Sequence, residues 1–293
     1  MIAKIIRLIR PHQYIKNGFV LIGVIFSGQW NLPTLISAVL AFLAFCAIAS
    51  AVYVINDILD VEEDRQHPTK RNRPLASGKL SMATAKITAV VLLITAVVLS
   101  VSVSGLALAI VLIYFVMNLA YSWRLKHIVI LDVFIISAGF MLRILAGTLG
   151  IGIAPTTWLL LCGFMVTLFL GFAKRRSELL TAEAMGGDAK LMRRVLDDYH
   201  PKMLDIFLGV TAACAILGYG LYAMSADTMQ IHGTRALVYT LPFVVYGIFR
   251  YIYLLYDKGY GTDTASDLLD DRHLLLTVAC WLLATLGILA WAR

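Results

Sequence analysis

The sequence predicts an all-α, polytopic membrane protein with about nine transmembrane helices. Of its 293 residues, 60% are hydrophobic and 15% are charged, and the mean hydropathy is +0.83. A soluble domain carries nearer 25% charged residues. Apolar runs of about 20 residues, the length that crosses a bilayer, recur along the chain. They lie at about 15–30, 33–55, 81–103, 105–122, 129–148, 156–173, 203–225, 235–256 and 274–292.

The N-terminal segment, residues 1–16, precedes the first and shortest of these runs. Lys4, Arg7 and Arg10 alternate there with isoleucine and leucine. This amphipathic pattern favours a surface helix over a cleavable signal peptide. The four cysteines all lie inside apolar runs without metal-ligand spacing, so we interpret them as packing residues.

Positive charge is concentrated on one side of the predicted membrane topology. Segments 1–16, 56–80, 123–128, 174–202 and 257–273 hold 20 of the 25 lysines and arginines. The positive-inside rule places these segments, and the N-terminus, in the cytoplasm. We therefore expect one integral-membrane domain over residues 1–293 in a bacterial inner membrane, with cytoplasmic catalytic loops at 56–80, 123–128, 174–202 and 257–273.

The net charge of +7 favours anionic partners at that face. Anionic lipid headgroups and phosphorylated substrates fit a membrane-embedded basic surface better than nucleic acid does. The opposite loops are very short, which favours chemistry at one face over transport. The sequence leaves a homo-oligomer open.

Three aspartates follow the second apolar run directly. On a helix, Asp57, Asp60 and Asp64 are spaced i, i+3 and i+7, so their carboxylates share one face over roughly 10 Å. Mg²⁺ commonly joins one or two carboxylates to substrate phosphates. Lys70 and Arg73 come shortly afterwards. The pattern predicts a magnesium site for a phosphorylated substrate; the alternative is a solvated, acidic helix end.

Charged residues also occur at or inside later apolar runs. Asp132 and Arg143 are 11 residues apart, about three helical turns, which predicts a shared helix face. An arginine at that depth is costly and normally faces a cavity or a partner. A basic cluster, Lys174-Arg175-Arg176, is followed by Glu178, four residues after Lys174. Further along the chain, we expect residues 193–202 to form an amphipathic surface helix. For these basic clusters, ordinary positive-inside flanking and a solvated face stay open.

These motifs resemble the UbiA superfamily of membrane prenyltransferases. The matching residues are Asn56-Asp57-x-x-Asp60-x-x-x-Asp64, Arg73-Pro74-Leu75-x-Ser77-Gly78, and Tyr121-Ser122 with Lys126 and Asp132. The resemblance covers most of the chain. It implies nine transmembrane helices around a cavity open to the cytoplasmic side.

Within the superfamily, the chain is most similar to the decaprenyl-phosphate phosphoribosyltransferases. The blocks at 10–17, 173–179 and 242–251 carry this likeness. The second Asp-x-x-x-Asp motif typical of prenyl-transferring members is replaced here by Asp132 and the adjacent pair Asp197-Asp198.

This resemblance implies Mg²⁺-dependent transfer of a 5-phosphoribosyl group from phosphoribosyl pyrophosphate to a polyprenyl phosphate of the decaprenyl type. The implied catalytic residues are Asp57, Asp60, Lys126 and Asp132, and the implied metal ligands are Asp57, Asp60 and Asp64. The implied substrate-binding residues are Lys16, Asn56, Lys70, Arg73, Tyr121, Arg143, Lys174, Arg175, Glu178, Tyr199 and Arg250. The alternatives are a prenyltransferase with an aromatic acceptor, and a transporter or lipid-binding membrane protein.

Overall fold

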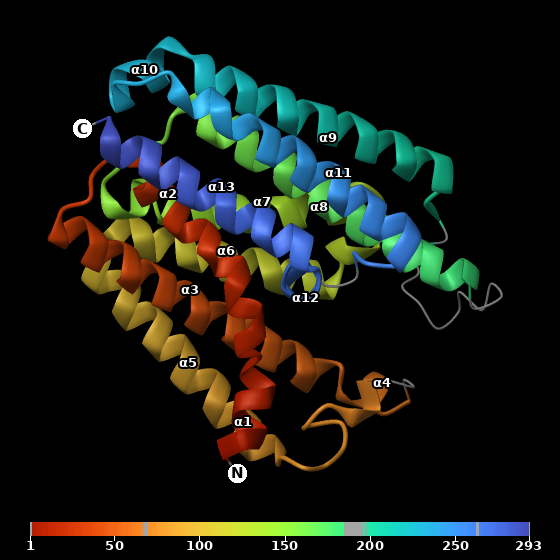
Figure 1. Ribbon diagram of the computed structural model, residues 1–293. Helices are drawn as coiled ribbons and strands as arrows, with labels where there is room; N and C mark the ends of the chain where they lie inside the picture. The colour runs from red at the N-terminus through yellow and green to blue at the C-terminus, as the bar shows by residue number, and fades with distance from the viewer. Residues whose placement is uncertain (1, 67–69, 185–195, 197, 262–263, 293) are drawn as a thin grey trace. The chain divides into compact units, whose positions relative to one another are not determined.

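The protein is a multi-pass, all-α membrane protein. A computed structural model describes residues 2–66, 70–184, 196, 198–261 and 264–292 (Figure 1). Within these ranges every regular element is a helix. Eight helical stretches in the described residues are long and apolar enough to cross a membrane. They match the second to the ninth of the expected spans.

The first expected span, at 15–30, does not form one long helix. Its residues are divided between a 3₁₀-helix, η1 (Pro11–Gly18), and the short α2 (Phe19–Ser27). The expected surface helix over 1–16 is also shorter, because α1 (Ile2–Ile9) ends where Arg10 adopts a left-handed conformation with φ 54°. The end of the helix has a local reason, since the residue before a proline is kept out of the right-handed α-helical region.

The chain divides into two compact units, which we describe separately. Unit 1 comprises residues 1–24, 30–125 and 142–154, and unit 2 comprises 25–29, 126–141 and 155–293. The single domain expected from the sequence stays a prediction.

The remaining elements of unit 1 are α3 (Leu32–Leu59), α4 (Val61–Gln66), η2 (Lys70–Asn72), α5 (Met82–Val103), α6 (Gly105–Trp123) and η4 (Leu149–Ile151). Those of unit 2 are α8 (Thr157–Ala184), α9 (Pro201–Met224), α10 (Ala226–His232), η7 (Ala236–Thr240), α11 (Leu241–Lys258), α12 (Thr264–Asp270) and α13 (Arg272–Trp291). Three elements are divided by unit boundaries: α2 (Phe19–Ser27), η3 (Leu125–His127) and α7 (Leu131–Ala146).

Several helices begin at a residue that caps the free backbone N–H groups. Asn31, Ser81, Ser104 and Asp271 each accept a hydrogen bond from the N–H group three residues further on. Such caps satisfy donors that have no partner in the first helical turn. Each of these spans therefore begins at a position that the local sequence specifies.

Small residues pack the core of unit 1. Helix α3 lies against α5 along much of its length (Figure 1). Ala41 and Ala44 of α3 and Ala85 and Ala89 of α5 are buried. Small side chains let membrane helices approach closely. This contact holds the C-terminal end of α3, where the aspartates lie, against the rest of the unit.

Two glycines make an even closer contact between α2 and the end of α7. A Cβ atom on Gly23 would lie 2.1 Å from the carbonyl oxygen of Gly147, and one on Gly147 would lie 1.6 Å from that of Val20. Neither glycine can carry a side chain unless the backbone moves. The short helix α2 is therefore fixed to the end of α7 by direct backbone packing.

Unit 2 has a larger, more aromatic core. In Figure 1, α8 and α9 run side by side, as do α11 and α13. Phe169, Phe172 and Tyr251 are buried in its largest apolar cluster, and Phe169 meets Tyr251 edge to face with centroids 5.8 Å apart. Phe172 likewise packs against Phe207 of α9. This core fixes the C-terminal half of α8, which carries the basic cluster Lys174-Arg175-Arg176.

Candidate active site

The aspartate-rich end of α3 forms the acidic part of the candidate site. Asp57 and Asp64 are both 2% exposed. Arg73 binds both of them through one nitrogen, at 3.1 Å from Asp57 and 2.6 Å from Asp64. Helix α3 ends at Leu59, but α4 begins two residues later, and Asp64 N still donates to Asp60 O. The near-continuous turn brings Asp57 and Asp64 together, whereas Asp60 lies half-buried at the junction.

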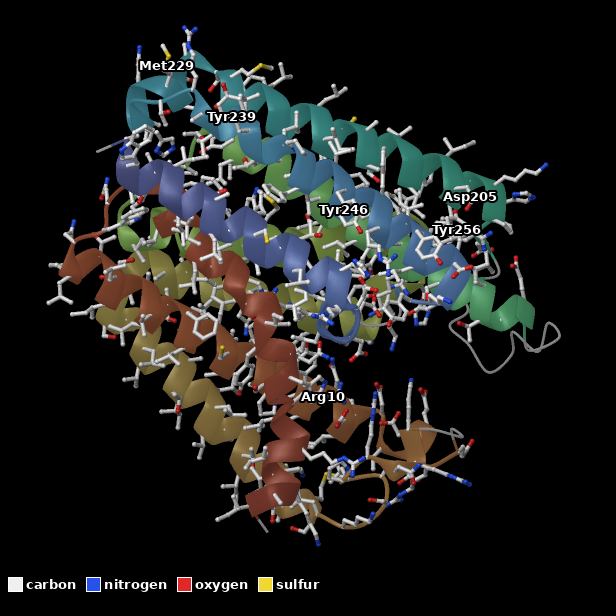
Figure 2. All side chains as sticks on the ribbon, in the orientation of Figure 1. Arg10, Asp205, Met229, Tyr239, Tyr246 and Tyr256 are labelled. Carbon is white, nitrogen blue, oxygen red and sulfur yellow. The ribbon has the colours of Figure 1, made fainter. Side chains whose placement is uncertain are left out.

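Arg10 is a member of this site that the sequence did not single out. Its guanidinium lies 2.5 Å from the Asp57 carboxylate and 5.1 Å from the centre of the Tyr53 ring. Figure 2 shows Arg10 where α1 gives way to η1. Arg10 and Asp57 are 47 residues apart, so no local pattern indicated the pair. The Arg10-Pro11 step was the one available signal, because it predicts a break in the helix there.

The other predicted residues of unit 1 lie on neighbouring elements. Asn56 accepts a hydrogen bond from Ser122 at 2.9 Å, which joins the ends of α3 and α6 beside the half-buried Tyr121. Lys16 donates to Gln13 within η1. Lys70 is exposed in η2. Of the predicted residues, the structure thus brings Arg73 and Asp57 into contact. Asn56, which directly precedes Asp57, is bonded to Ser122 instead.

The donor set at Asp57 and Asp64 is suited to a hard divalent cation. Carboxylate oxygens are the ligands that Mg²⁺ prefers. One guanidinium nitrogen touches both carboxylates, so a positive charge already fits between them. No group of three or more acidic, histidine or cysteine side chains suited to a metal occurs among the described residues. The chain itself therefore supplies two close carboxylates here, and Asp60 is not gathered with them.

A second buried ionic cluster lies in unit 2, at the start of α7. Asp132 and Arg175 are both fully buried, and Asp132 Oδ2 lies 2.6 Å from Arg175 Nε. These two atoms are not aligned as a hydrogen bond, so the contact is an ion pair. Arg175 also pairs with Glu178 one turn further along α8. Tyr199 donates to Asp132 Oδ1 at 2.7 Å and accepts from the backbone N–H of Ile130 at the same distance.

Tyr199 is held in its neutral form in this cluster. Burial, together with the hydrogen bond to Asp132, raises the pKa of Tyr199 above its usual range. A neutral phenol next to a carboxylate acts as a hydrogen-bond donor and not as a base. The cluster is therefore built to fix Asp132 and Arg175 in place.

The basic cluster and Glu178 lie on helix α8, although the sequence was expected to form a cytoplasmic loop at 174–202. Helix α8 continues to Ala184. The sequence analysis grouped the basic residues at Lys174 with Glu178, and the structure pairs Glu178 with Arg175 of the same cluster. Residues 193–195 and Asp197 of the expected surface helix lie outside the described residues, and Lys202 belongs to α9.

Arg250 and Lys126 complete the predicted set. Arg250 of α11 binds Asp271 at 2.7 Å and lies over the Tyr253 ring at 5.1 Å. The hydrogen bond from Arg250 holds the pKa of the Asp271 carboxyl below its usual range. Lys126 is half-buried in η3.

Arg143 does not share the surroundings of Asp132, although both lie on α7. It is 5% exposed. It donates to Asn17 at 2.7 Å and to Tyr114 at 3.0 Å. Its contacts are therefore with unit 1, whereas those of Asp132 are with unit 2. Arg143 is buried against partners, as expected for an arginine inside a span.

The sequence analysis also missed a clamp at the end of α8. Arg176 donates to Asp205 of α9 at 2.7 Å and lies 5.6 Å from the centre of the Tyr256 ring of α11. Asp205 also accepts from the Tyr256 hydroxyl, and Figure 2 shows both residues at the adjacent ends of their helices. The clamp joins three helices directly beside Arg175.

The helical fold and these buried ionic clusters define a membrane-embedded, helical protein of the UbiA class. The chain belongs to the UbiA prenyltransferase family, whose model matches residues 18–269. It is similar, with 35% identity over 94% of its length and 83% of the relative, to the decaprenyl-phosphate phosphoribosyltransferase of Corynebacterium glutamicum. It is 33% identical to the protein of that name from Mycolicibacterium smegmatis, over 98% of this chain and 92% of the relative.

A solved structure supports the fold. A UbiA homolog from Archaeoglobus fulgidus bound to GPP and Mg²⁺ superposes with a TM-score of 0.70, covering 98% of this chain and 99% of that one at 17% identity. At that identity the likeness concerns the fold alone. The expected UbiA-type architecture is therefore confirmed.

Proposed function

We propose that this protein transfers a 5-phosphoribosyl group from phosphoribosyl pyrophosphate to a polyprenyl phosphate. The carrying observation is its identity of 33–35%, over 94–98% of the chain, to proteins named decaprenyl-phosphate phosphoribosyltransferase. The clusters of basic side chains support the proposal, because both substrates are phosphorylated.

We assign Asp57 and Asp64 to holding Mg²⁺; Asp60, which is half-buried where α3 meets α4, stays a predicted third ligand. A bound Mg²⁺ would neutralise the charge of the diphosphate leaving group. Arg73 touches both carboxylates, so a diphosphate bound to the same metal would also meet its guanidinium. Lys16 and Lys70 are assigned to the remaining donor phosphates, and Lys126, which belongs to unit 2, stays a predicted catalytic residue. Asn56 and Tyr121 would line the donor site beside Asp57.

The reaction needs little acid–base chemistry from the chain. The lipid phosphate is an anion at neutral pH, so its oxygen can attack C1 of the ribose directly. The C1–O bond to pyrophosphate breaks, and both electrons of that bond leave with pyrophosphate. Direct displacement predicts inversion at C1. The work left to the protein is positioning and electrostatic stabilisation.

We assign Lys174 and Arg250 to the lipid phosphate, since both are cations in the C-terminal halves of unit 2 helices, α8 and α11. Arg175 was predicted to share this task. Its complete burial between Asp132 and Glu178 supports an indirect role, in which it orients Glu178. Asp132 and Tyr199 then fix Arg175 and do not themselves react. Burial supports an indirect role for Arg143 in the same way.

We further propose a bacterial inner-membrane location with the N-terminus and the catalytic residues in the cytoplasm. The supporting observation is the bias of lysine and arginine toward the segments named above. This orientation would place the site where soluble phosphoribosyl pyrophosphate is available.

The proposal is tested with purified protein in detergent, phosphoribosyl pyrophosphate, a polyprenyl phosphate and Mg²⁺. We expect pyrophosphate release that requires the lipid and is blocked by EDTA, with a lipid product heavier than the acceptor by one phosphoribosyl unit. The competing activity, suggested by the family description, is prenyl transfer. Consumption of a polyprenyl diphosphate with an aromatic acceptor, and no phosphoribosyl product, would replace our proposal with that one.

A further inference from the structure

The segment η1 has an unusual backbone. It is a 3₁₀-helix of eight residues, whereas runs longer than three or four residues are uncommon because their hydrogen bonds have poorer geometry. It also begins at Arg10, which is left-handed with φ 54°. Its own backbone bonding does not explain why this conformation is retained, so its anchors to neighbouring helices become important.

Side chains on η1 fall into three rows, because residues three apart eclipse one another in a 3₁₀-helix, and two of these rows matter here. Gln13 and Lys16 form one row and are hydrogen-bonded to each other. Tyr14 and Asn17 form the next row and contact α3. Ser50 donates to the carbonyl oxygen of Ile9 at 2.9 Å and its hydroxyl lies 3.0 Å from that of Tyr14. One row is thus anchored and the other carries Lys16.

Arg143 provides the second anchor, at Asn17. Asn17 is 1% exposed; it accepts from Arg143 Nε at 2.7 Å and donates to Cys46 at 3.3 Å. The Arg143 guanidinium is itself held over the rings of Tyr114 and Phe45, at 4.8 and 5.6 Å. A planar cation fixed on two rings has little freedom to follow Asn17 if η1 changes shape.

We propose that Arg143 is a positioning residue for the phosphorylated sugar donor. Acting through Asn17, it keeps η1 in its 3₁₀ form and so sets the position of Lys16. If η1 relaxed to an α-helix, Lys16 would rotate by about 100° relative to Pro11 and shift by about 2.5 Å along the axis. The inference rests on the proposed function, because it takes Lys16 as a ligand of a donor phosphate.

The first test compares Arg143→Gln with wild type in the detergent assay. We expect the KM for phosphoribosyl pyrophosphate to rise about tenfold or more, while the KM for the polyprenyl phosphate stays within about twofold. Donor binding in the presence of Mg²⁺, measured by calorimetry without the lipid, should weaken by the same factor. Equal increases in both KM values would overturn the inference.

The second test combines Arg143→Gln with Lys16→Ala. If Arg143 acts through Lys16, it should change donor binding by less than about twofold once Lys16 has been removed, because coupled residues are not additive. Full additivity would overturn the inference. Arg143→Lys, which keeps a single donor for Asn17, should recover part of the donor affinity.

Two controls separate positioning from general stability. Ser50→Ala removes the other anchor of η1 with little change in side-chain volume. It should reproduce the selective loss of donor binding. If Arg143→Gln does not fold, Ser50→Ala becomes the test of the inference. Arg176→Gln removes a second buried arginine, in the α8–α9–α11 clamp, and should lower the unfolding temperature without a donor-selective defect. Wild-type protein that neither binds nor turns over the donor would refute the proposed function itself, whereas an active wild type with unselective variants refutes only this inference.

Discussion

At the scale of single residues, the candidate site consists of charges that are buried together with their partners. Asp57 and Asp64 are almost fully buried, and a carboxylate in such a place needs a cation or hydrogen bonds to remain charged. Arg10 and Arg73 fill this role. The charges are therefore held at fixed positions before any substrate binds.

Asp57→Asn should abolish phosphoribosyl transfer, with a loss of at least about 100-fold in kcat/KM. The substitution keeps the shape of the side chain but removes the negative charge assigned to Mg²⁺. The measurement is pyrophosphate release over a range of Mg²⁺ concentrations. Asp227→Asn, in the exposed part of α10, is the matched control and should behave as wild type. Activity near the wild-type level in Asp57→Asn would remove the metal assignment.

Tyr199→Phe should lower the free energy of unfolding by about 1–3 kcal/mol, because Asp132 and the N–H of Ile130 lose their partner. The defect should depend on pH. The pKa of Tyr199 is raised in the folded protein, so its contribution is complete below the unfolded pKa of about 10 and is lost as the pH rises through the folded pKa.

The difference between wild type and Tyr199→Phe should therefore be constant from about pH 7 to pH 9 and shrink above about pH 10. Thermal unfolding in detergent at these pH values provides the measurement. A difference that grows with alkaline pH would contradict the hydrogen-bonding scheme.

Residues of the site were predictable from the sequence where their contacts are local. The spacing of Asp57 and Asp64 indicated a shared face, and Arg73 follows them closely. Arg10 and Asp57 are 47 residues apart, and Tyr199 and Asp132 are 67 apart. Such pairs depend on how helices pack, which a single sequence does not reveal.

At the scale of elements, the start of α13 shows how a loop is fixed to a span. Asp271 caps α13 through the N–H of Leu274 at 2.7 Å and also accepts from Arg250 of α11. One carboxylate thus performs two tasks. The two can be separated, because asparagine caps a helix nearly as well as aspartate but carries no charge.

Asp271→Ala should cost about 1 kcal/mol more than Asp271→Asn, because only the alanine variant loses the cap. The pKa of Asp271 is lowered in the folded protein. Its ionic contribution is therefore complete above the unfolded pKa of about 3.9 and is lost as the pH falls through the folded pKa. Wild type and Asp271→Asn should converge in unfolding temperature below about pH 4. A gap that persists in acid would show that the Arg250 pair is not its source.

Element boundaries were predicted well where hydropathy changes abruptly and poorly where it does not. Eight spans matched the apolar runs. The extension of α8 to Ala184 was missed, because its last turns are charged and are stabilised by the Arg175–Glu178 pair. The 3₁₀ form of η1 was not predictable, since its anchors lie on α3 and α7.

At the scale of the whole molecule, the predicted topology has strongly basic segments on one side and very short loops on the other. The opposite loops carry Arg235 and the terminal Arg293. Such a bias sets orientation in the membrane. It also concentrates soluble anions near the basic face.

Single cysteines at Ser77 and Arg235, both exposed, test this orientation. They are introduced after replacement of Cys46, Cys162, Cys214 and Cys280. In intact cells, an impermeant maleimide should label position 235 and leave position 77 unlabelled, and permeabilised cells should be labelled at both. The reverse pattern in intact cells would invert the proposed topology.

The anchor between Asn17 and Arg143 also has a consequence for the order of biosynthesis. The two residues are 126 positions apart, and ribosomes add about 5–20 residues per second. The segment η1 therefore leaves the ribosome roughly ten seconds before its anchor has been made. During that interval the first helices enter the bilayer without the contact between Asn17 and Arg143, so η1 gains this anchor only after α7 has been made.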